Sequence, residues 1–319
     1  MPATIAHALL AEDVFYKLDK KVQRTIDLKR FYTFAQASDP FMFFYISFNK
    51  KGKEIRKLQK IAHTEKTFLF FLNTINYIKD KKYYKDKDTL TFLYGFIAHY
   101  ILDSTVHPLV VYKTGYFDKN NKSSYKYNGL HTYMETYIDN YLLEKRNLEL
   151  NFNKYIYTKS FSNNLNDTID YSFKKTYYKE NISSIYFKAL KQMKFALNSF
   201  RKDTIGIKAS IYSFLDKFNS EKTFKFKTIS YNLDDFEMYD FLNLNHKTWN
   251  YPVDKNIKKN SSFNDLYLES VNKTYYIINN LNDYFFNNKK IDLQFLIKNN
   301  SYLTGISCYK KLKQQFFEF

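Results

Sequence analysis

The chain has 319 residues, and its 45% hydrophobic fraction is enough for a substantial core, which excludes a wholly disordered protein. It carries a formal net charge of +18, but its Lys and Arg form no dense cluster, a distribution more typical of a solvated surface than of a docking site. One cysteine, Cys308, excludes an internal disulfide and a cysteine-based zinc site, and six Gly and four Pro are too few for an all-β fold or a glycine-loop nucleotide site.

The first part of the chain is predicted to form helices in close succession. Apolar residues recur every three or four positions, the period of a helix with one buried face. The segments with this period are 3–20, 55–79, 90–109 and 130–146. A polar loop at 118–129 separates the last two. The N-terminus lacks the basic start and unbroken apolar run of a secretory signal, so we expect a cytoplasmic protein.

The segment 89–112 is the most apolar part of the chain. It contains His99, Asp103 and His107, and placing three ionisable groups in lipid would be costly. We therefore expect a buried core helix and no transmembrane segment.

The helical period continues more weakly beyond residue 150, and no internal repeat is visible. The further candidate helices are 185–201, 205–218, 262–284 and 291–303. We expect an irregular connection at 219–260, which contains the only tryptophan. The chain would then consist of a core at 1–150 and a helical region at 151–319 that completes or covers it.

The histidines are distributed unevenly, since five of the six lie in the first 131 residues. His99, Asp103 and His107 stand at positions i, i+4 and i+8, and His131 and Glu135 form a second i, i+4 pair. Side chains at this spacing share one face of a helix, and two nitrogen or oxygen donors one turn apart can chelate a zinc ion. Hydrogen-bonded core histidines or a structural ion-pair network would use the same residues, but the clustering favours a metal site.

The string LYGFIAHYILDSTVHP, followed by a loop and then GLHTYMETYID, resembles the core of the bacterial zinc-dependent phospholipase C family. These all-helical enzymes are related in fold to single-strand-specific zinc nucleases. The segments MPATIAH, SDPFMFFY and IAHTEKTFLFF fall in the order of that family, and the resemblance is strong over 1–145 and weak at LNLNHKTWNYP. It implies a multi-helix phospholipase C-like bundle with a metal cluster between the helices.

Position by position, the resemblance implies up to three zinc ions. The first would be held by His63, His99 and Asp103. The second would be held by His107, His131 and Glu135. The third would be held by His7 and a bridging oxygen of Asp103.

The resemblance also implies a catalytic carboxylate, Asp39, acting as general base or orienting the attacking water. The chain departs from the pattern of the secreted members in two places near these residues. Three residues separate Asp103 from His107, where those members have five, and Ala37-Ser38 stands where they have Gly-Pro.

The N-terminus departs from that pattern as well, because the secreted members expose an N-terminal tryptophan and this chain begins Met1-Pro2. Their free amine completes the third metal site. Removal of Met1 would place the nitrogen of Pro2 about one and a half helical turns from His7, so we expect this amine to replace the one in the family.

For two further features we favour a structural role over a functional one. His246 lies near the only tryptophan without a second donor at helical spacing, and we expect a structural or surface role for it. A cluster of aromatic residues could line a lipid or base pocket, but such clusters are more often core. Its members are Phe41, Phe43, Phe44 and Tyr45.

The resemblance and the donor set together predict a zinc-dependent phosphodiester hydrolase, phospholipase C-like, that cleaves a phospholipid or related phosphodiester with a metal-activated water. One alternative is a zinc nuclease, for which the positive charge and the aromatic residues would serve nucleic-acid binding. The other is a non-catalytic helical protein whose metals are structural.

Overall fold

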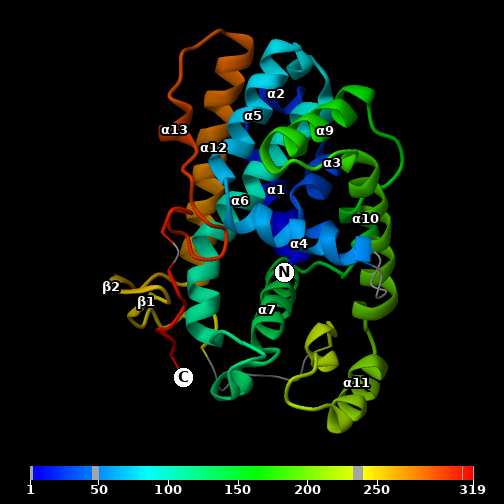
Figure 1. Ribbon diagram of the computed structural model, residues 1–319, viewed down its shortest axis with the longest axis vertical. Helices are drawn as coiled ribbons and strands as arrows, with labels where there is room; N and C mark the ends of the chain where they lie inside the picture. Colours follow the sequence, from blue (N-terminus) through cyan, green and yellow to red (C-terminus); the bar gives the residue numbers. More distant parts are fainter. Residues whose placement is uncertain (1–2, 45–49, 233–239, 311, 319) are drawn as a thin grey trace.

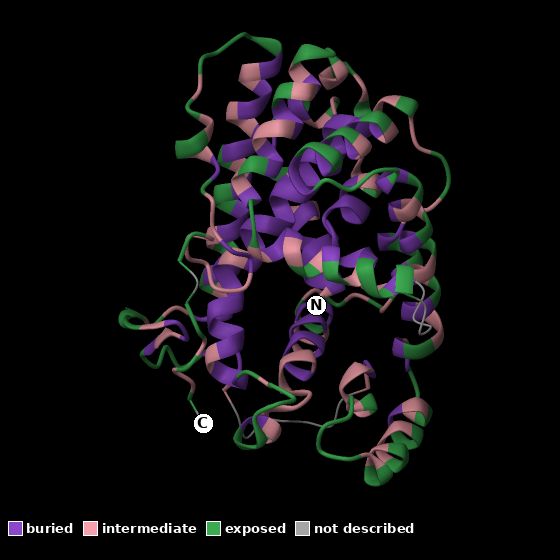
Figure 2. Ribbon diagram, viewed as in Figure 1, coloured by how far each residue is buried: buried purple, intermediate pink, exposed green. Residues whose placement is uncertain are grey.

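Helix α6 (Lys87–Thr114) is the longest of the described helices, and it is buried along almost its whole length (Figures 1 and 2). The computed structural model describes residues 3–44, 50–232, 240–310 and 312–318. Within them the regular structure is helical apart from one two-stranded sheet, which confirms the predicted all-α fold. None of the described helices combines the length and the apolar character needed to cross a membrane.

The N-terminal helices pack around α6. Their bounds are α1 (Thr4–Lys17), α2 (Lys20–Gln23), α3 (Leu28–Phe34), η1 (Asp39–Phe43), α4 (Lys50–Thr64), α5 (Thr67–Asp80), η2 (Tyr83–Lys85), η3 (Lys122–Tyr127) and α7 (Leu130–Lys145). Helices α1, α3 and α7 contact α6, and α1 also contacts α3 and α7. The apolar faces predicted from the helical period thus meet in one core.

The segments after residue 150 extend this core. Their bounds are α8 (Phe152–Tyr155), α9 (Asn163–Tyr177), α10 (Ile182–Ala196), η4 (Leu197–Arg201), α11 (Ile207–Phe218), η5 (Phe226–Ile229), α12 (Phe263–Phe286) and α13 (Leu293–Leu296). Helix α12 lies along α6, and α9 lies along α5 (Figure 1). Strands β1 (Trp249–Tyr251) and β2 (Asp254–Lys259) pair antiparallel, and β1 contacts α6.

A side-chain cap that the sequence contains marks the start of helix α6, but the helix runs past its predicted end at residue 109 to Thr114. The Asp86 side chain accepts a hydrogen bond from the Thr89 N–H and caps the first turn. Pro108 lies inside the helix, and its ring nitrogen cannot donate to the Ser104 carbonyl. Gly305 packs against that carbonyl so closely that a Cβ would lie 2.5 Å from the oxygen. The C-terminal segment therefore lies directly against α6.

The prediction of one helix over 55–79 is wrong, because the chain turns at Lys66 and forms α4 and α5 instead. Lys66 has a φ of 54°, which ends the helical path. The carbonyl of His63, in the last turn of α4, accepts a hydrogen bond from the Tyr302 N–H at 2.8 Å. The N–H of a residue near the C-terminus thus hydrogen-bonds to the last turn of α4. No pattern within 55–79 indicates this contact.

Two other predictions in the second half need correction. Of the predicted helix at 291–303 only α13 forms, and the residues after it run irregularly beside α6, where the Tyr100 hydroxyl donates to the Lys298 carbonyl at 2.6 Å. The predicted connection at 219–260 contains η5 and the small sheet, and its residues 233–239 lie outside the described part.

The aromatic cluster after Asp39 belongs to the core where it is described. Phe41 is fully buried, and its ring contacts those of Phe173 and Tyr186. Phe44 is buried and Phe43 is partly buried against the same core. The fourth member of the cluster, at position 45, lies outside the described residues.

Candidate metal centre

The structure brings all the predicted donors to one place between α1, α4, α6 and α7. They are His7 of α1, Asp39 of η1, His63 of α4, His99, Asp103 and His107 of α6, and His131 and Glu135 of α7. All of them are buried except His131, whose side chain is 31% exposed. Their donor atoms form three groups that could each hold a metal ion: Asp39, His63 and His99; His107, His131 and Glu135; and His7, His99 and Asp103.

The first group lies where atoms from three elements, η1, α4 and α6, meet. His63 Nε2 lies 3.1 Å from Asp39 Oδ1, 3.3 Å from His99 Nε2 and 3.6 Å from Asp103 Oδ2, and His99 Nε2 lies 3.0 Å from that same oxygen. Ligands about 2.0 Å from a tetrahedral zinc ion lie about 3.3 Å from one another. Asp39, His63 and His99 therefore offer atoms that could hold one ion, and Asp103 Oδ2 lies beside both histidines.

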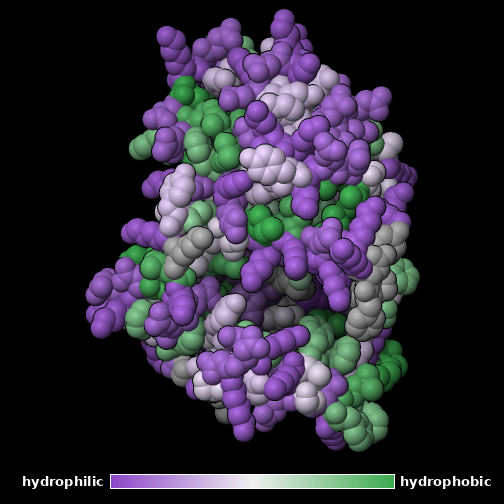
Figure 3. Space-filling view, viewed as in Figure 1, coloured by the Kyte–Doolittle hydropathy of each residue, from purple (hydrophilic) through white to green (hydrophobic). Residues whose placement is uncertain are grey.

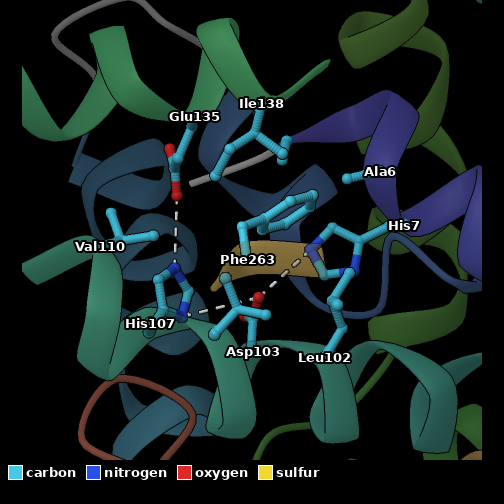
Figure 4. Close-up of a pocket in the computed structure, with 11 residues that line it drawn as sticks. Ala6, His7, Leu102, Asp103, His107, Val110, Glu135, Ile138 and Phe263 are labelled. Atoms are coloured by element: carbon cyan, nitrogen blue, oxygen red, sulfur yellow. Dashed lines mark hydrogen bonds and ion pairs between the residues drawn. The ribbon is translucent and has the colours of Figure 1, made fainter. Parts of the chain in front are cut away.

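The second group joins the end of α6 to the start of α7 (Figure 4). Glu135 Oε1 lies 3.3 Å from His107 Nε2 and 3.1 Å from His131 Nε2. Three protein donors would leave a zinc ion with one open position, and the partly exposed side chain of His131 places this group near solvent. The short spacing between Asp103 and His107 thus still allows His107 to face Glu135.

The third group depends on Asp103, which lies between the other two. Asp103 Oδ1 is 3.2 Å from His7 Nε2 and 3.6 Å from His107 Nδ1 (Figure 4). The other oxygen, Oδ2, faces the first group, 3.0 Å from His99 Nε2. His7 Nδ1 is buried and has no hydrogen-bond partner among the residues that the structure describes. The proposed amine of Pro2 lies outside the described residues.

Backbone carbonyls orient three of the histidine rings. His63 Nδ1 is 2.9 Å from the Gln59 carbonyl, His99 Nδ1 is 2.8 Å from that of Ala35, and His107 Nδ1 is 3.1 Å from that of Tyr302. A carbonyl only accepts, so each Nδ1 carries the hydrogen, and in the neutral ring the Nε2 lone pair points into the cluster.

These lone pairs face carboxylate oxygens at 3.0 to 3.3 Å. Two acceptors so close repel each other unless a cation lies between them, either a proton on the imidazole or a metal ion. Nitrogen and oxygen donors at tetrahedral spacing, with backbone acceptors behind the rings, are what zinc sites require. The donor set therefore fits zinc.

The electrostatics of the cluster keep its carboxylates ionised. Burial would raise the pKa of Asp103, but His107, His99 and His7 hold it well below its usual range. Burial opposes ionisation of Glu135 as well, and neighbouring histidines nevertheless lower its pKa. Ionised carboxylates are the form that binds metal.

The pKa values of three histidines are shifted in two directions. Burial, reinforced by His99, lowers the pKa of His7 to about 4, so His7 is neutral at neutral pH. Burial alone would also lower the pKa values of His99 and His107, but the charge of Asp103 raises both. In the absence of a metal, protons on His99 and His107 would therefore compensate the carboxylates.

Several residues that support the centre were not predicted from the sequence. The Gln59 side chain donates to Asp39 Oδ1 at 3.0 Å, and its position one helical turn before His63 is a local signal. Asp139 accepts hydrogen bonds from the N–H groups of Ile5 and Ala6 and so holds the start of α1, next to His7. Tyr302 has no such signal, because it is remote in sequence from every donor.

His246 is not part of the centre. Its ring is exposed, with Nδ1 3.2 Å from the Asn260 carbonyl and 3.5 Å from Asp265 Oδ2. This position agrees with the expected structural or surface role.

We expect Gly95→Ala to weaken both the fold and zinc binding. A Cβ at Gly95 would lie 2.5 Å from Phe34 Cβ and 2.6 Å from its carbonyl carbon, so α3 would have to move away from α6. That movement would displace Ala35, whose carbonyl orients His99 one turn further along α6. The loss should be about 1–3 kcal/mol in the free energy of unfolding and about tenfold in zinc affinity, measured by denaturation and by competition with a chelator.

The control is Gly115→Ala at the far end of α6, where a Cβ would meet the Tyr127 ring at 2.3 Å and the φ is +67°. This variant should lose stability without losing zinc affinity. Equal zinc affinity in Gly95→Ala and the unmodified protein would contradict the role assigned to the contact between α3 and α6.

Comparison with known proteins identifies a family. The family model described as zinc dependent phospholipase C matches residues 1–200, which include every donor of the three groups. No curated protein and no solved structure matches the chain significantly.

Proposed function

The chain belongs to the zinc-dependent phospholipase C family, and on that premise we propose that it hydrolyses phospholipids at the bond between phosphorus and the glycerol oxygen. The observation that carries the proposal is the position of Asp103, whose two oxygens face different donor groups. Such a shared carboxylate would hold metal ions side by side, the arrangement that suits a phosphodiester with several charged oxygens.

The proposed ligands follow the three donor groups. The first zinc would bind His63, His99 and Asp103, with Asp39 beside it. The second would bind His107, His131 and Glu135. The third would bind His7 and Asp103. Bound zinc supplies Lewis acidity, which makes water a better nucleophile at neutral pH and offsets the negative charge of the phosphoryl oxygens.

The residues of the chain would prepare this reaction in distinct ways. The carbonyls of Gln59, Ala35 and Tyr302 hold the imidazole rings so that no reorientation is needed during the reaction. The partly exposed His131 marks the side from which a substrate can approach. In the products, the water oxygen would belong to the phosphorylated head group, and the diacylglycerol oxygen would carry a proton.

Asp39 would act on the attacking water more by orientation than by proton storage. Burial would raise its pKa, but His99 and His63 lower it below its ordinary range, so the carboxylate stays ionised. An ionised carboxylate of low basicity accepts a hydrogen bond from water but holds a transferred proton poorly.

The proposal is tested by offering the zinc-loaded protein three substrates. They are phosphatidylcholine in detergent micelles, a soluble short-chain phosphatidylcholine and a single-stranded oligonucleotide. We expect diacylglycerol and phosphocholine from the lipids, with little dependence on salt because the head group is zwitterionic. Bound zinc is measured in the same preparation, and we expect at least two ions per chain, as the donor groups allow.

The two alternative functions give different results. Oligonucleotide cleavage that falls steeply with salt, with both lipids left intact, would identify a nuclease. Two or more bound zinc ions without hydrolysis of any of the three substrates would point to structural metals and would defeat the proposal.

A further inference from the structure

Helix α11 presents its apolar residues to solvent. Of its 12 residues, all of which the structure describes, Ala209 alone is buried. The apolar side chains on the outside include Ile207, Ile211, Phe214, Leu215 and Phe218. Phe214 is 59% exposed and Phe218 is 76% exposed. A helix of a folded domain ordinarily turns this face toward the core, so the exposed face of α11 needs a partner.

The apolar surface extends beyond the helix. Ile205 before α11 and Phe224 and Phe226 after it are exposed as well, and the rings of Phe214 and Phe218 lie 5.1 Å apart. Figure 3 shows this surface as a green area at the lower right, where Figure 1 places α11. We call residues 205–226 the α11 surface.

The charge around the α11 surface is positive. Residues 202–227 contain six lysines and three acidic residues. Two of the three acidic side chains are engaged with the chain itself: Asp203 is buried and accepts from the Ala209 N–H, and Asp216 accepts from the N–H groups of Phe226 and Lys227. Lys217 and Lys222 are exposed. The combination of exposed aromatic residues and lysines suits the head-group region of an anionic bilayer.

The α11 surface is attached to the part of the molecule that carries the metal centre. The side chain of Asn128 donates to the carbonyls of Glu221 and Thr223 at 2.7 and 2.6 Å, and Thr136 donates to the carbonyl of Thr228 at 3.0 Å. These contacts bracket the start of α7, where the exposed side of His131 lies. In Figure 3 the green area lies on the same face as a recess in the middle of the molecule.

We propose that the α11 surface docks the protein on bilayers that contain anionic phospholipid, with the aromatic side chains in the head-group region and the lysines beside the lipid phosphates. The choice of lipid as occupant rests on the proposed function and on charge complementarity. A second copy of the chain would bring the same positive charge to the interface and would be repelled. Docking through this surface would hold the open side of the metal centre close to its substrate.

The test is co-sedimentation of the zinc-loaded protein with vesicles made of equal parts phosphatidylcholine and phosphatidylglycerol. The variant Phe214→Ser/Phe218→Ser should bind these vesicles at least about tenfold more weakly than the unmodified protein. The matched control is Phe295→Ser, at a phenylalanine of α13 that is 74% exposed outside the α11 surface, and it should bind normally. A second variant, Lys217→Glu/Lys222→Glu, should lose binding to these vesicles and keep its fold.

Head-group release from the same vesicles and from soluble short-chain phosphatidylcholine separates this inference from the proposed function. The phenylalanine variant should hydrolyse the soluble lipid normally and the vesicles slowly. Vesicle binding without any hydrolysis would defeat the proposed function and leave the docking surface standing. Unchanged binding of both variants would overturn the docking surface, as would an equal loss in Phe295→Ser. A change from dimer to monomer in the phenylalanine variant without lipid would assign the surface to a second copy instead.

Discussion

Replacement of Asp103 by asparagine is expected to abolish hydrolysis and to reduce the zinc content of the purified protein by more than one ion. Both oxygens of Asp103 face donor groups, at 3.2 Å from His7 Nε2 and 3.0 Å from His99 Nε2. The amide of asparagine has no charge and offers a single good oxygen donor, so it cannot bridge the two groups and is a weaker ligand for either. We expect kcat/KM to fall at least about a thousandfold, or about 4 kcal/mol in transition-state stabilisation.

The control for this substitution lies on the same helix. Asp88 is buried near the start of α6, where it forms an ion pair with Arg30 at 2.6 Å and accepts from the Ser162 N–H. Asp88→Asn removes a buried charge of the same kind and should lower stability without changing zinc content or kcat/KM. If Asp103→Asn retained its full zinc content, Asp103 would be a structural residue and the shared-ligand assignment would fail.

Removal of zinc is expected to destabilise the protein and to reverse the pH dependence of its stability above about pH 6.5. At a free zinc concentration a hundred times the dissociation constant, each site adds about 2.7 kcal/mol to the free energy of unfolding. The ligands must lose their protons to bind the ion, so this contribution grows as the pH rises. The zinc-loaded protein should therefore become more stable from slightly acid to slightly alkaline pH.

The metal-free protein should behave in the opposite way over the same range. The charge of Asp103 outweighs burial and raises the pKa values of His99 and His107 above their unfolded value. The folded state then holds protons that the unfolded state releases, so this stabilisation is complete below about pH 6.5 and is lost as the pH rises through the folded pKa values. The pKa of His7 is lowered to about 4, so His7 stays neutral in the folded state, and it contributes nothing once the pH is well above its unfolded value of about 6.5.

The measurement is denaturant unfolding of the chelator-treated and the zinc-loaded protein at several pH values between about 6.5 and 8.5. Two slopes of opposite sign are expected. A metal-free protein that gains stability over this range, or a zinc-loaded protein no more stable than the metal-free one, would contradict the compensation of the buried carboxylates by protons on His99 and His107.

The fold was predictable where the pattern was local. The helical period of the apolar residues is a property of each segment, and it predicted α1, α7, α10, α11 and α12 close to their observed bounds. Two of the errors fall where contact with a distant segment decides the structure. The break at Lys66 coincides with the contact between His63 and Tyr302, and the helix expected at 291–303 gives way to irregular chain held by Tyr100.

The candidate centre likewise has a part that the local pattern predicts and a part that depends on contacts between distant segments. The spacing of His99, Asp103 and His107, and of His131 and Glu135, is set along single helices, so the sequence alone predicted a donor set of nitrogen and oxygen and its division between two helices. The roles of these residues as ligands, and of Asp39 in catalysis, stay predictions. Their convergence with His7, Asp39 and His63 is an observation of the structure.

The sequence by itself determined the class of fold and the kind of donor available to a metal, because the helical period and the residue types are properties of each segment alone. Only the tertiary structure decided which oxygen of Asp103 faces which group and which carbonyls orient the rings of His63, His99 and His107. It also decided that the apolar face of α11 stays exposed. The physical reason is that periodicity shows which side chains share a face, whereas contact between segments remote in sequence determines what that face meets.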